Sequence, residues 1–419
     1  MSGRAKGVET LNPADAALLS MLPGPFLDWF RAFARDLPWR RDKEPYHVWL
    51  SEIMLQQTRV EAVRGYYSRF IDALPDISSL ADAPEEMVYK LWEGLGYYRR
   101  AANLHKAARM VVRDMGGVFP STYEGILALP GVGAYTAGAV ASICFGLPKP
   151  AVDGNVIRVL ARILDSDASQ SSAVFKRQVE AGLEAVMTGA MKPSAMKPGA
   201  AAAAAAAAAK PGAAGLAGDL AGDFSQSLME IGAVLCLPRG VPKCGACPAS
   251  GFCRSCRSGR AELLPVRDLK KARRVEELTV FVLWKAAKPI EGVNGESGDG
   301  GGSNESGGSR EESLALRRRG GKGLLAGMWE LPNAPGLLDP GEAMAQVSAW
   351  GVGPASLERS LDRVHVFSHV EWRMRGYVIR VGSGSPGQGG MGGGDITWAT
   401  AEERLKAYPL PTAFSLFLT

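Results

Sequence analysis

The chain contains 419 residues with a formal net charge of +5, and hydrophobic residues make up 46% of it. This length allows two domains with separate cores, and the composition is typical of a globular protein. No apolar run reaches the roughly 18 residues needed to cross a membrane, and residues 1–24 lack the pattern of a signal peptide. We therefore expect a cytoplasmic, nucleoid-associated protein. The small positive charge permits nucleic-acid binding without indicating it.

The first half of the chain has the pattern of a helical domain, which we place at residues 26–256. Apolar residues recur at three- and four-residue spacing, and glycine or proline separates successive runs. Residues 1–25 are interpreted as a flexible tail. The predicted helices cover residues 26–37, 46–57, 59–74, 84–93, 97–115, 134–145 and 156–164.

A low-complexity segment, residues 187–222, interrupts the helical pattern. It contains Lys-Pro pairs and an unbroken run of alanines, Ala200–Ala209. Alanine favours helix, but a pure alanine run has no amphipathic face that can dock on a core. We therefore expect an exposed insertion, after which helical periodicity resumes at Phe224.

A second domain with a different pattern is predicted at residues 275–419. Short runs rich in β-branched and aromatic residues indicate strands. We place these strands at residues 278–284, 313–318, 363–367 and 377–381. Glycine- and serine-rich segments at 292–310 and 382–395 are expected to be flexible loops. A basic stretch, residues 257–274, is the predicted linker between the helical domain and this α+β domain.

The segment Leu129-Pro-Gly-Val-Gly133 lies between two predicted helices. Gly131 and Gly133 permit a tight turn and leave backbone N–H groups uncovered where the next helix begins, at Ala134. The positive end of a helix with free N–H groups is a phosphate-binding site by geometry. An ordinary turn between two helices is the alternative.

Two carboxylates, Asp153 and Glu52, are candidate catalytic residues because of their positions in predicted helices. Asp153, followed by Asn155, lies at the start of a predicted helix, where it is either a helix N-cap or a catalytic carboxylate at a cleft. Glu52 lies in an otherwise apolar helical run, where an unpaired carboxylate is costly. For Glu52 the alternative is a solvated side chain on the polar face of its helix.

Four of the six cysteines form one short cluster, Cys236, Cys244, Cys247 and Cys253. Without a secretory context, such clustering favours a metal or iron–sulfur site over disulfides. Four thiolates suit zinc as well as an iron–sulfur cluster, so the residue types alone leave both open.

Together these segments resemble the adenine DNA glycosylase family of the helix–hairpin–helix superfamily. The matching segments, in the family's order, are residues 49–58, 129–138, 152–156, the cysteine cluster, 323–332 and 366–369. The cysteine spacing C-x7-C-x2-C-x5-C departs from the family's C-x6-C-x2-C-x5-C by one residue in the first gap. The resemblance implies a mainly α helix–hairpin–helix glycosylase domain with an iron–sulfur cluster subdomain, followed by an α+β Nudix-like domain.

The resemblance also implies roles for individual residues. Glu52 would be the acid that protonates the leaving adenine, and Asp153 would stabilise the positive sugar. Tyr135 and Asn155 would position Asp153 and water. The four clustered cysteines would hold a [4Fe–4S] cluster. The expected contacts to DNA or to the flipped adenine are those of Arg40, Leu55, Gln56, Gln57, Thr58, Tyr97, Gly131, Gly133 and Gln226.

In the second domain, the resemblance implies that Phe367, Ser368 and His369 read 8-oxoguanine. The helix before Gly351 has alanine or serine where a Nudix hydrolase needs metal-binding glutamates, so this domain is expected to read a base without hydrolysing a nucleotide. The expected substrate is double-stranded DNA with adenine opposite 8-oxoguanine or guanine, bound by a monomer.

An endonuclease III-type lyase acting on oxidised pyrimidines is the alternative activity. Such relatives use a lysine amine to cut the strand, and Tyr135 occupies that lysine's position here. They also lack a glutamate at the position of Glu52. A damage-sensing protein without catalysis would have lost Glu52 or Asp153, and both are present. The resemblance therefore implies a monofunctional glycosylase that leaves an abasic site.

Overall fold

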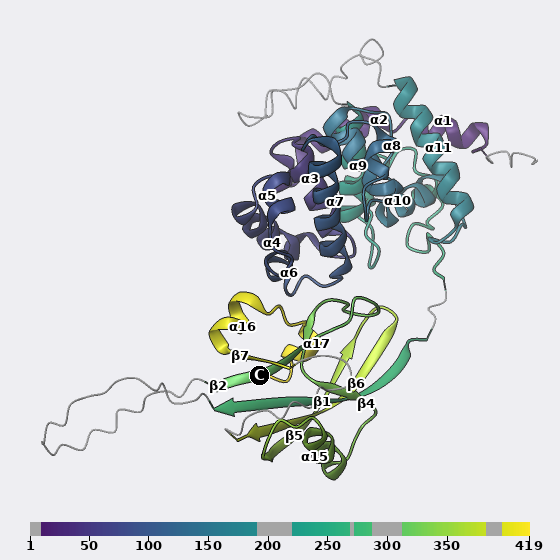
Figure 1. Cartoon of the computed structure of the whole chain (residues 1–419). Helices are drawn as coiled ribbons and strands as arrows, with labels where there is room; N and C mark the ends of the chain where they lie inside the picture. The colour runs from purple at the N-terminus through teal and green to yellow at the C-terminus, as the bar shows by residue number, and fades with distance from the viewer. Residues whose placement is uncertain (1–9, 191–219, 269–271, 287–311, 383–395) are drawn as a thin grey trace, which may run out of the picture. The chain divides into compact units, whose positions relative to one another are not determined.

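The structure is a computed structural model that describes residues 10–190, 220–268, 272–286, 312–382 and 396–419. The chain divides into two compact units (Figure 1). The first comprises residues 1–82 and 103–270, and the second comprises residues 83–102 and 271–419. Within the described residues, no helix combines the length and the apolar character that crossing a membrane requires.

The first unit is built from helices. They are α1 (Pro13–Ser20), α2 (Pro23–Phe33), η1 (Pro38–Arg40), α3 (Pro45–Leu55), α4 (Val60–Ala73), α5 (Ile77–Asp82), α7 (Arg99–Met115), α8 (Tyr123–Leu127), α9 (Ala134–Phe145), α10 (Gly154–Leu164), α11 (Ala173–Ala190), α13 (Leu220–Val234), η2 (Cys244–Ala246) and α14 (Arg254–Arg257). Helix α6 (Glu85–Trp92) and the first turn of α7 group with the second unit. Every predicted helix is present, with ends shifted by a few residues.

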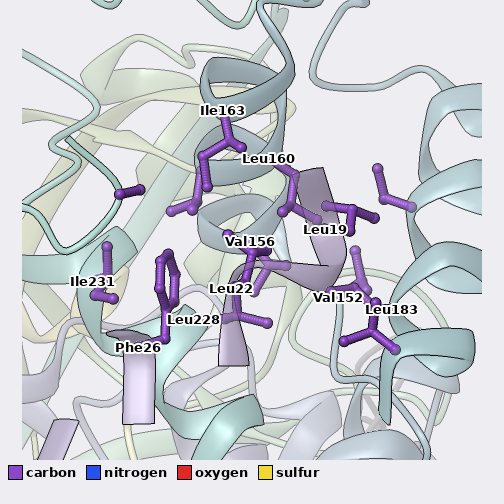
Figure 2. Packing of buried hydrophobic residues seen from close by; sticks show 14 of the residues in the cluster. Leu19, Leu22, Phe26, Val152, Val156, Leu160, Ile163, Leu183, Leu228 and Ile231 are labelled. Carbon is purple, nitrogen blue, oxygen red and sulfur yellow. The ribbon is translucent and has the colours of Figure 1, made fainter. Parts of the chain in front are cut away.

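Helix α10 runs through an apolar core of this unit. All of its residues from Val156 to Leu164 are buried. Figure 2 shows its apolar side chains among those of neighbouring helices, with Leu19, Phe26, Leu183, Leu228 and Ile231 labelled. Because each fully buried side chain of this kind contributes roughly 1.5–3 kcal/mol, the position of α10 is strongly determined, and so is that of the segment just before it.

The interpretation of residues 1–25 as a flexible tail is wrong for its second part. Asn12 caps α1 by accepting a hydrogen bond from the Asp15 backbone N–H over 2.9 Å, and Leu19 and Leu22 are fully buried. The apolar stripe of this eight-residue helix is too short to stand out as a periodicity in the sequence. Residues 1–9 lie outside the described residues.

The predicted boundaries of the insertion and the linker also differ from the structure. Helix α11 continues to Ala190 with Met187 buried, and α13 already begins at Leu220. Residues 191–219, which include the alanine run, lie outside the described residues. In the predicted linker 257–274, Leu264 is buried and its carbonyl accepts a hydrogen bond from Arg162 over 2.8 Å. The first part of that segment therefore packs onto the helical unit.

The described residues of the second unit form a seven-stranded sheet with the order β3-β2-β1-β6-β5, while β4 pairs with β1 and β7 with β2. The strands are β1 (Arg274–Ala286), β2 (Glu312–Arg318), β3 (Trp329–Glu330), β4 (Asn333–Pro335), β5 (Ala355–Val366), β6 (Val370–Val381) and β7 (Thr397–Thr400). Its further helices are α15 (Pro340–Ala349), α16 (Ala401–Ala407) and α17 (Thr412–Ser415). Strands β1 and β6 are parallel, and β5 and β6 are antiparallel neighbours.

Strand β1 shows why this part of the chain forms a sheet covered on both faces. Val280 and Val282 belong to one apolar cluster, which includes α17, and Phe281 and Leu283 belong to another, which includes α15. Successive side chains of a strand point to opposite faces, so a continuous apolar run suits a sheet with two buried faces. The predicted strands and the α+β class are confirmed. The predicted loops, apart from Gly382, lie outside the described residues.

Candidate active site

A cavity of about 630 Å³ in the first unit is lined by residues of η1, α3, α9 and α13 and of the start of α10. Ligand-binding cavities commonly measure roughly 300–1,000 Å³. The predicted site residues that line it are Arg40, Glu52, Leu55, Gln56, Gln57, Thr58, Tyr135, Asp153, Asn155 and Gln226. The fold therefore brings both candidate carboxylates, which are far apart in the sequence, to one cavity.

Glu52 is buried, with 5% of its surface exposed. The Tyr135 hydroxyl donates a hydrogen bond to its Oε2 over 2.8 Å. Burial raises the pKa of Glu52 to about 7; the Tyr135 hydrogen bond and Arg40 oppose this rise, and the charge of Asp153 adds to it. The alternative of a solvated Glu52 is wrong. A carboxylic acid that holds its proton near neutral pH is suited to general-acid chemistry.

Asp153 is the N-cap of α10. Its Oδ1 accepts a hydrogen bond from the Val156 backbone N–H over 2.8 Å, and its Oδ2 accepts one from the Asn155 side-chain amide over 2.7 Å. Burial raises the pKa of Asp153, and these hydrogen bonds oppose the rise. The N-cap interpretation is confirmed. It does not compete with a role in chemistry, because the same side chain lines the cavity.

Arg158, which was not predicted from the sequence, connects this carboxylate to the cysteine segment. Its buried guanidinium donates to Asn155 Oδ1 over 2.8 Å, to the Gly232 carbonyl over 2.7 Å and to the Cys236 carbonyl over 2.8 Å. A Cβ on Gly232 would lie 2.7 Å from the Asn155 Cβ, so this close approach of α13 to α10 requires glycine. The sequence signal for such a role is an arginine among apolar residues in the middle of a helix, which α10 shows at Arg158 and at Arg162.

Glu230 on α13 lines the cavity and was also not predicted. Its carboxylate accepts hydrogen bonds from Arg35 Nε over 2.6 Å and from Arg40 Nη2 over 2.9 Å. Burial acts to raise its pKa, but the hydrogen bonds and charges of the two arginines outweigh it and lower the pKa of Glu230 to about 2. Glu230 is therefore an anion that fixes Arg40 at the cavity wall. Its signal is the same as that of Glu52, a carboxylate in an apolar helical run.

The predicted hairpin lies between α8 and α9. Gly131 has a φ of +78°, and a Cβ there would lie 2.6 Å from the Asn103 Cβ, so both the backbone and the space require glycine. Gly133 is the N-cap of α9, where a Cβ would meet nothing within 4 Å. Because glycine has no side chain, it makes no capping hydrogen bond to the N–H groups at the start of α9. These N–H groups therefore stay available, which suits phosphate binding.

Two predicted DNA-contacting residues have left-handed backbone conformations. Gln57, just after α3, has a φ of +57°, and Tyr97, just before α7, has a φ of +50°. Such conformations cost roughly 1–3 kcal/mol and cluster at functional sites. Gln57 lines the cavity, whereas Tyr97 does not and belongs to the second unit. Tyr97 is also 45% exposed, and the Arg100 guanidinium lies over its ring, 5.5 Å from the centroid.

The four predicted ligand cysteines and Cys256 line one pocket beside α10. All are free thiols, and Arg162 donates a hydrogen bond to Cys236 Sγ over 3.2 Å. In the part of the chain that the structure describes, no three His, Cys, Asp or Glu side chains converge where a single metal ion would sit. A tetrahedral zinc site needs its sulfurs about 2.3 Å from one ion. An iron–sulfur cluster takes its thiolates at separate irons, and the four cysteines that line this pocket match the ligand number of either group.

The predicted reader residues form the turn between β5 and β6. The ring of Phe367 packs edge-on against His365 and Trp372, with centroids 4.5 and 4.9 Å away. Ser368 and His369 are exposed, and Ser368 Oγ lies 3.2 Å from His369 Nδ1. One partly buried aromatic ring, packed against two neighbouring rings, therefore supports two exposed polar side chains, an arrangement that suits contact with a base edge.

Helix α15 has alanine, serine and alanine at positions 345, 348 and 349. Its glutamate, Glu342, is used in a capping box with Asp339. This helix therefore offers none of the carboxylates that a hydrolase would use for its metal.

Comparison with known protein families agrees with this geometry. The HhH-GPD superfamily of base excision DNA repair proteins matches residues 50–184, a range that includes Glu52, the hairpin and Asp153. The NUDIX domain family matches residues 309–419. The fold and the cavity together define a base excision DNA repair protein of the helix–hairpin–helix class, joined to a Nudix domain.

Relatives that match most of the chain show to which family within this class the chain belongs. The adenine DNA glycosylase of Homo sapiens is 33% identical over 409 residues, which cover 89% of this chain and 69% of that protein. The adenine DNA glycosylase of Mus musculus is 31% identical over 427 residues, which cover 92% and 75%. The chain belongs to the adenine DNA glycosylase family. Among solved structures, a thermostable thymine-DNA glycosylase aligns over 58% of this chain and 99% of its own, with 26% identity and a TM-score of 0.46.

Proposed function

We propose that the protein excises adenine paired with 8-oxoguanine or guanine in double-stranded DNA and leaves an abasic site for base excision repair. The observation that carries this proposal is Glu52, a buried carboxylic acid with a pKa of about 7 in a cavity that it shares with Asp153. Membership of the adenine DNA glycosylase family indicates which base enters that cavity.

Adenine stacked in a duplex cannot be reached, so it must first leave the stack and enter the cavity. Glu52 in its acid form then donates a proton to N7 of the base, which turns a poor anionic leaving group into a neutral one. Tyr135 holds Glu52 through its hydrogen bond of 2.8 Å. Arg40, which Glu230 fixes, and Leu55 line the same cavity and would contact the base.

Departure of the base breaks the bond between N9 and C1′ and leaves positive charge on the sugar. Asp153 as a carboxylate stabilises that charge, and Asn155 holds Asp153 in place. The ionised Glu52 then takes a proton from water as the water oxygen bonds to C1′, which restores the acid. This division of work between two carboxylates is that of a glycosidase.

Cleavage of the DNA strand by such a protein would need an amine nucleophile that forms a Schiff base. Tyr135 stands where lyase relatives have lysine, and its hydroxyl lies within hydrogen-bonding distance of Glu52 and Met229. The product is therefore an intact strand with an abasic site, which breaks only after alkali treatment.

The four clustered cysteines are assigned in this proposal to a [4Fe–4S] cluster. Their shared pocket supports this assignment, as does the membership of the chain in the adenine DNA glycosylase family. When bound, the cluster supplies iron–thiolate bonds that tie residues 236–253 together beside α10. Purified protein should contain iron and acid-labile sulfide in equal molar amounts. Protein containing zinc as its sole metal would contradict the assignment.

Ser368 and His369 are assigned to the base opposite adenine. 8-Oxoguanine differs from guanine by an acceptor at C8 and a donor at N7. A serine hydroxyl both donates and accepts, so Ser368 can meet either group. The packing of Phe367 against two aromatic rings supports the assignment, because it holds the turn in one shape.

The substitution Glu52→Gln tests the central proposal. An amide cannot transfer the proton, so adenine excision should fall by about 10²- to 10⁴-fold, the usual contribution of a general acid. Excision is measured by alkali cleavage of duplexes with adenine opposite 8-oxoguanine, guanine, cytosine or thymine. The matched control is Glu262→Gln, at an exposed position outside the cavity. Undiminished excision by Glu52→Gln, or no adenine excision by the natural protein, would overturn the proposal.

A further inference from the structure

Met229 on α13 lines the same cavity as Glu52, and its sulfur lies 3.0 Å from the Tyr135 hydroxyl oxygen. The same hydroxyl lies 2.8 Å from Glu52 Oε2. A phenol has a single proton to donate. The carboxyl group and the thioether therefore compete for one hydrogen bond.

We propose that Met229 is a positioning residue for the acid step, because its sulfur offers Tyr135 an acceptor other than Glu52. This inference rests on the proposed function, in which Glu52 is the acid that protonates adenine. It concerns how Glu52 keeps its proton at the pH at which it must act.

The hydrogen bond from Tyr135 acts against the chemistry that Glu52 has to perform. It favours the ionised form of the carboxyl group and so lowers the pKa of Glu52. An acceptor on the other side of the phenol draws the same proton away for part of the time. The acid form of Glu52 then persists to higher pH than it would beside a tyrosine with no second acceptor.

A thioether suits this task because it is a weak acceptor. A stronger acceptor would hold the phenol proton permanently and remove the support that Tyr135 gives to the ionised Glu52 in the water-activation step. Methionine competes without capturing the proton, so Tyr135 can serve both protonation states of Glu52.

The charged and titratable groups around Glu52 do not offer this competition. Arg40 from η1 is a cation and has no acceptor. Asp153, at the start of α10, is held by two hydrogen bonds from its own segment, and Glu230 on α13 is held by two arginines. Within the described part of the chain, the Tyr135 hydroxyl has the sulfur of Met229 as its acceptor besides Glu52.

The substitution Met229→Leu removes the acceptor and keeps a similar volume. The single-turnover rate of adenine excision is measured between pH 5.5 and pH 9. The decline of the rate at alkaline pH should begin about 0.5–1 pH unit lower, which makes the variant about three- to tenfold slower at pH 8.5. At pH 6 its rate should stay within about twofold of the natural protein, since at least about half of Glu52 is still protonated in the variant. Met229→Ile gives a second acceptor-free side chain with the same expectation.

Two controls separate this effect from packing. Met187→Leu makes the same chemical change at a buried core position outside the cavity and should leave the pH profile unchanged. Tyr135→Phe removes the hydroxyl, so Tyr135→Phe with Met229→Leu should have the same profile as Tyr135→Phe alone.

The inference is overturned if Met229→Leu leaves the alkaline decline in place, or if it shifts that decline equally in the Tyr135→Phe background. In the second case Met229 acts through burial and not through the hydroxyl. Failure of the natural protein to excise adenine at any pH would instead overturn the proposed function.

Discussion

Among single residues, the burial of Glu52 has a cost for folding that depends on pH. Its pKa is raised from 4.5 to about 7, so above pH 4.5 the folded state keeps a proton that the unfolded state loses. The stability contributed by this proton is fully present below the unfolded pKa and is lost as the pH rises through the folded pKa. The protein is therefore expected to lose stability between about pH 5 and pH 8.

The Glu52→Gln variant should lack this loss, because an amide does not ionise. Its free energy of unfolding relative to the natural protein should rise by about 2–3 kcal/mol between pH 5 and pH 8.5. Urea unfolding at the two pH values measures the difference, with Glu262→Gln as the baseline. If the two proteins kept the same difference in stability at both pH values, the burial argument for Glu52 would fail. The Glu52→Gln variant should therefore be more stable at alkaline pH and less active, as expected when a functional group is buried at a cost to stability.

At the scale of structural elements, the hairpin between α8 and α9 contains two glycines that differ in their role. The fold requires Gly131, whereas packing does not require glycine at position 133. Gly131→Ala should destabilise the fold by about 1–3 kcal/mol, because residue 131 has a positive φ and its Cβ would clash with Asn103. Gly133→Ser should preserve stability, since serine is a favourable N-cap and there is room for it.

The Gly133→Ser variant is nevertheless expected to bind DNA about tenfold less tightly. Its hydroxyl would accept a hydrogen bond from the N–H groups that a DNA phosphate needs, and one charge-assisted hydrogen bond is worth about that much. Thermal unfolding and binding to a duplex of fixed length at one salt concentration measure the two effects. Unchanged affinity in Gly133→Ser would favour the ordinary-turn alternative for this hairpin.

At the scale of the whole molecule, the residues proposed for the chemistry and those proposed to read the opposite base belong to different units. The cavity is lined by residues of the first unit, and Phe367–His369 belong to the second. Replacing both Ser368 and His369 by alanine should therefore reduce the preference for 8-oxoguanine over guanine by about 1–3 kcal/mol, the scale of one or two base-edge contacts. Excision of adenine opposite guanine should remain unchanged.

The ratio of single-turnover rates on the two duplexes measures this preference. Ser356→Ala, at an exposed position of β5 in the same unit, is the matched control and should keep the natural ratio. A double variant that prefers 8-oxoguanine as strongly as the natural protein would remove the reader role from this turn.

The sequence by itself determined the local features of this protein. The positions of α3, α9 and α10 follow from helical periodicity within a few residues. The strand run 278–284 follows from its β-branched and aromatic residues, the hairpin follows from its glycines, and the cysteine spacing is read directly. The sequence also indicated both carboxylates as candidate site residues. Glu52 is a charged residue in an otherwise apolar helical run, and Asp153 lies at the start of a predicted helix. The short helix α1 did not stand out, since eight residues are too few to show a period.

Only the tertiary structure decided which distant residues share the site. Arg35 and Glu230 are 195 positions apart and pair directly, and Met229 reaches a tyrosine on another helix. Such contacts depend on how helices pack, and local periodicity contains no information about which helices become neighbours. The raised pKa of Glu52 is decided at the same level, because it results from burial, and burial exists only once α3, α9 and α13 have enclosed the cavity.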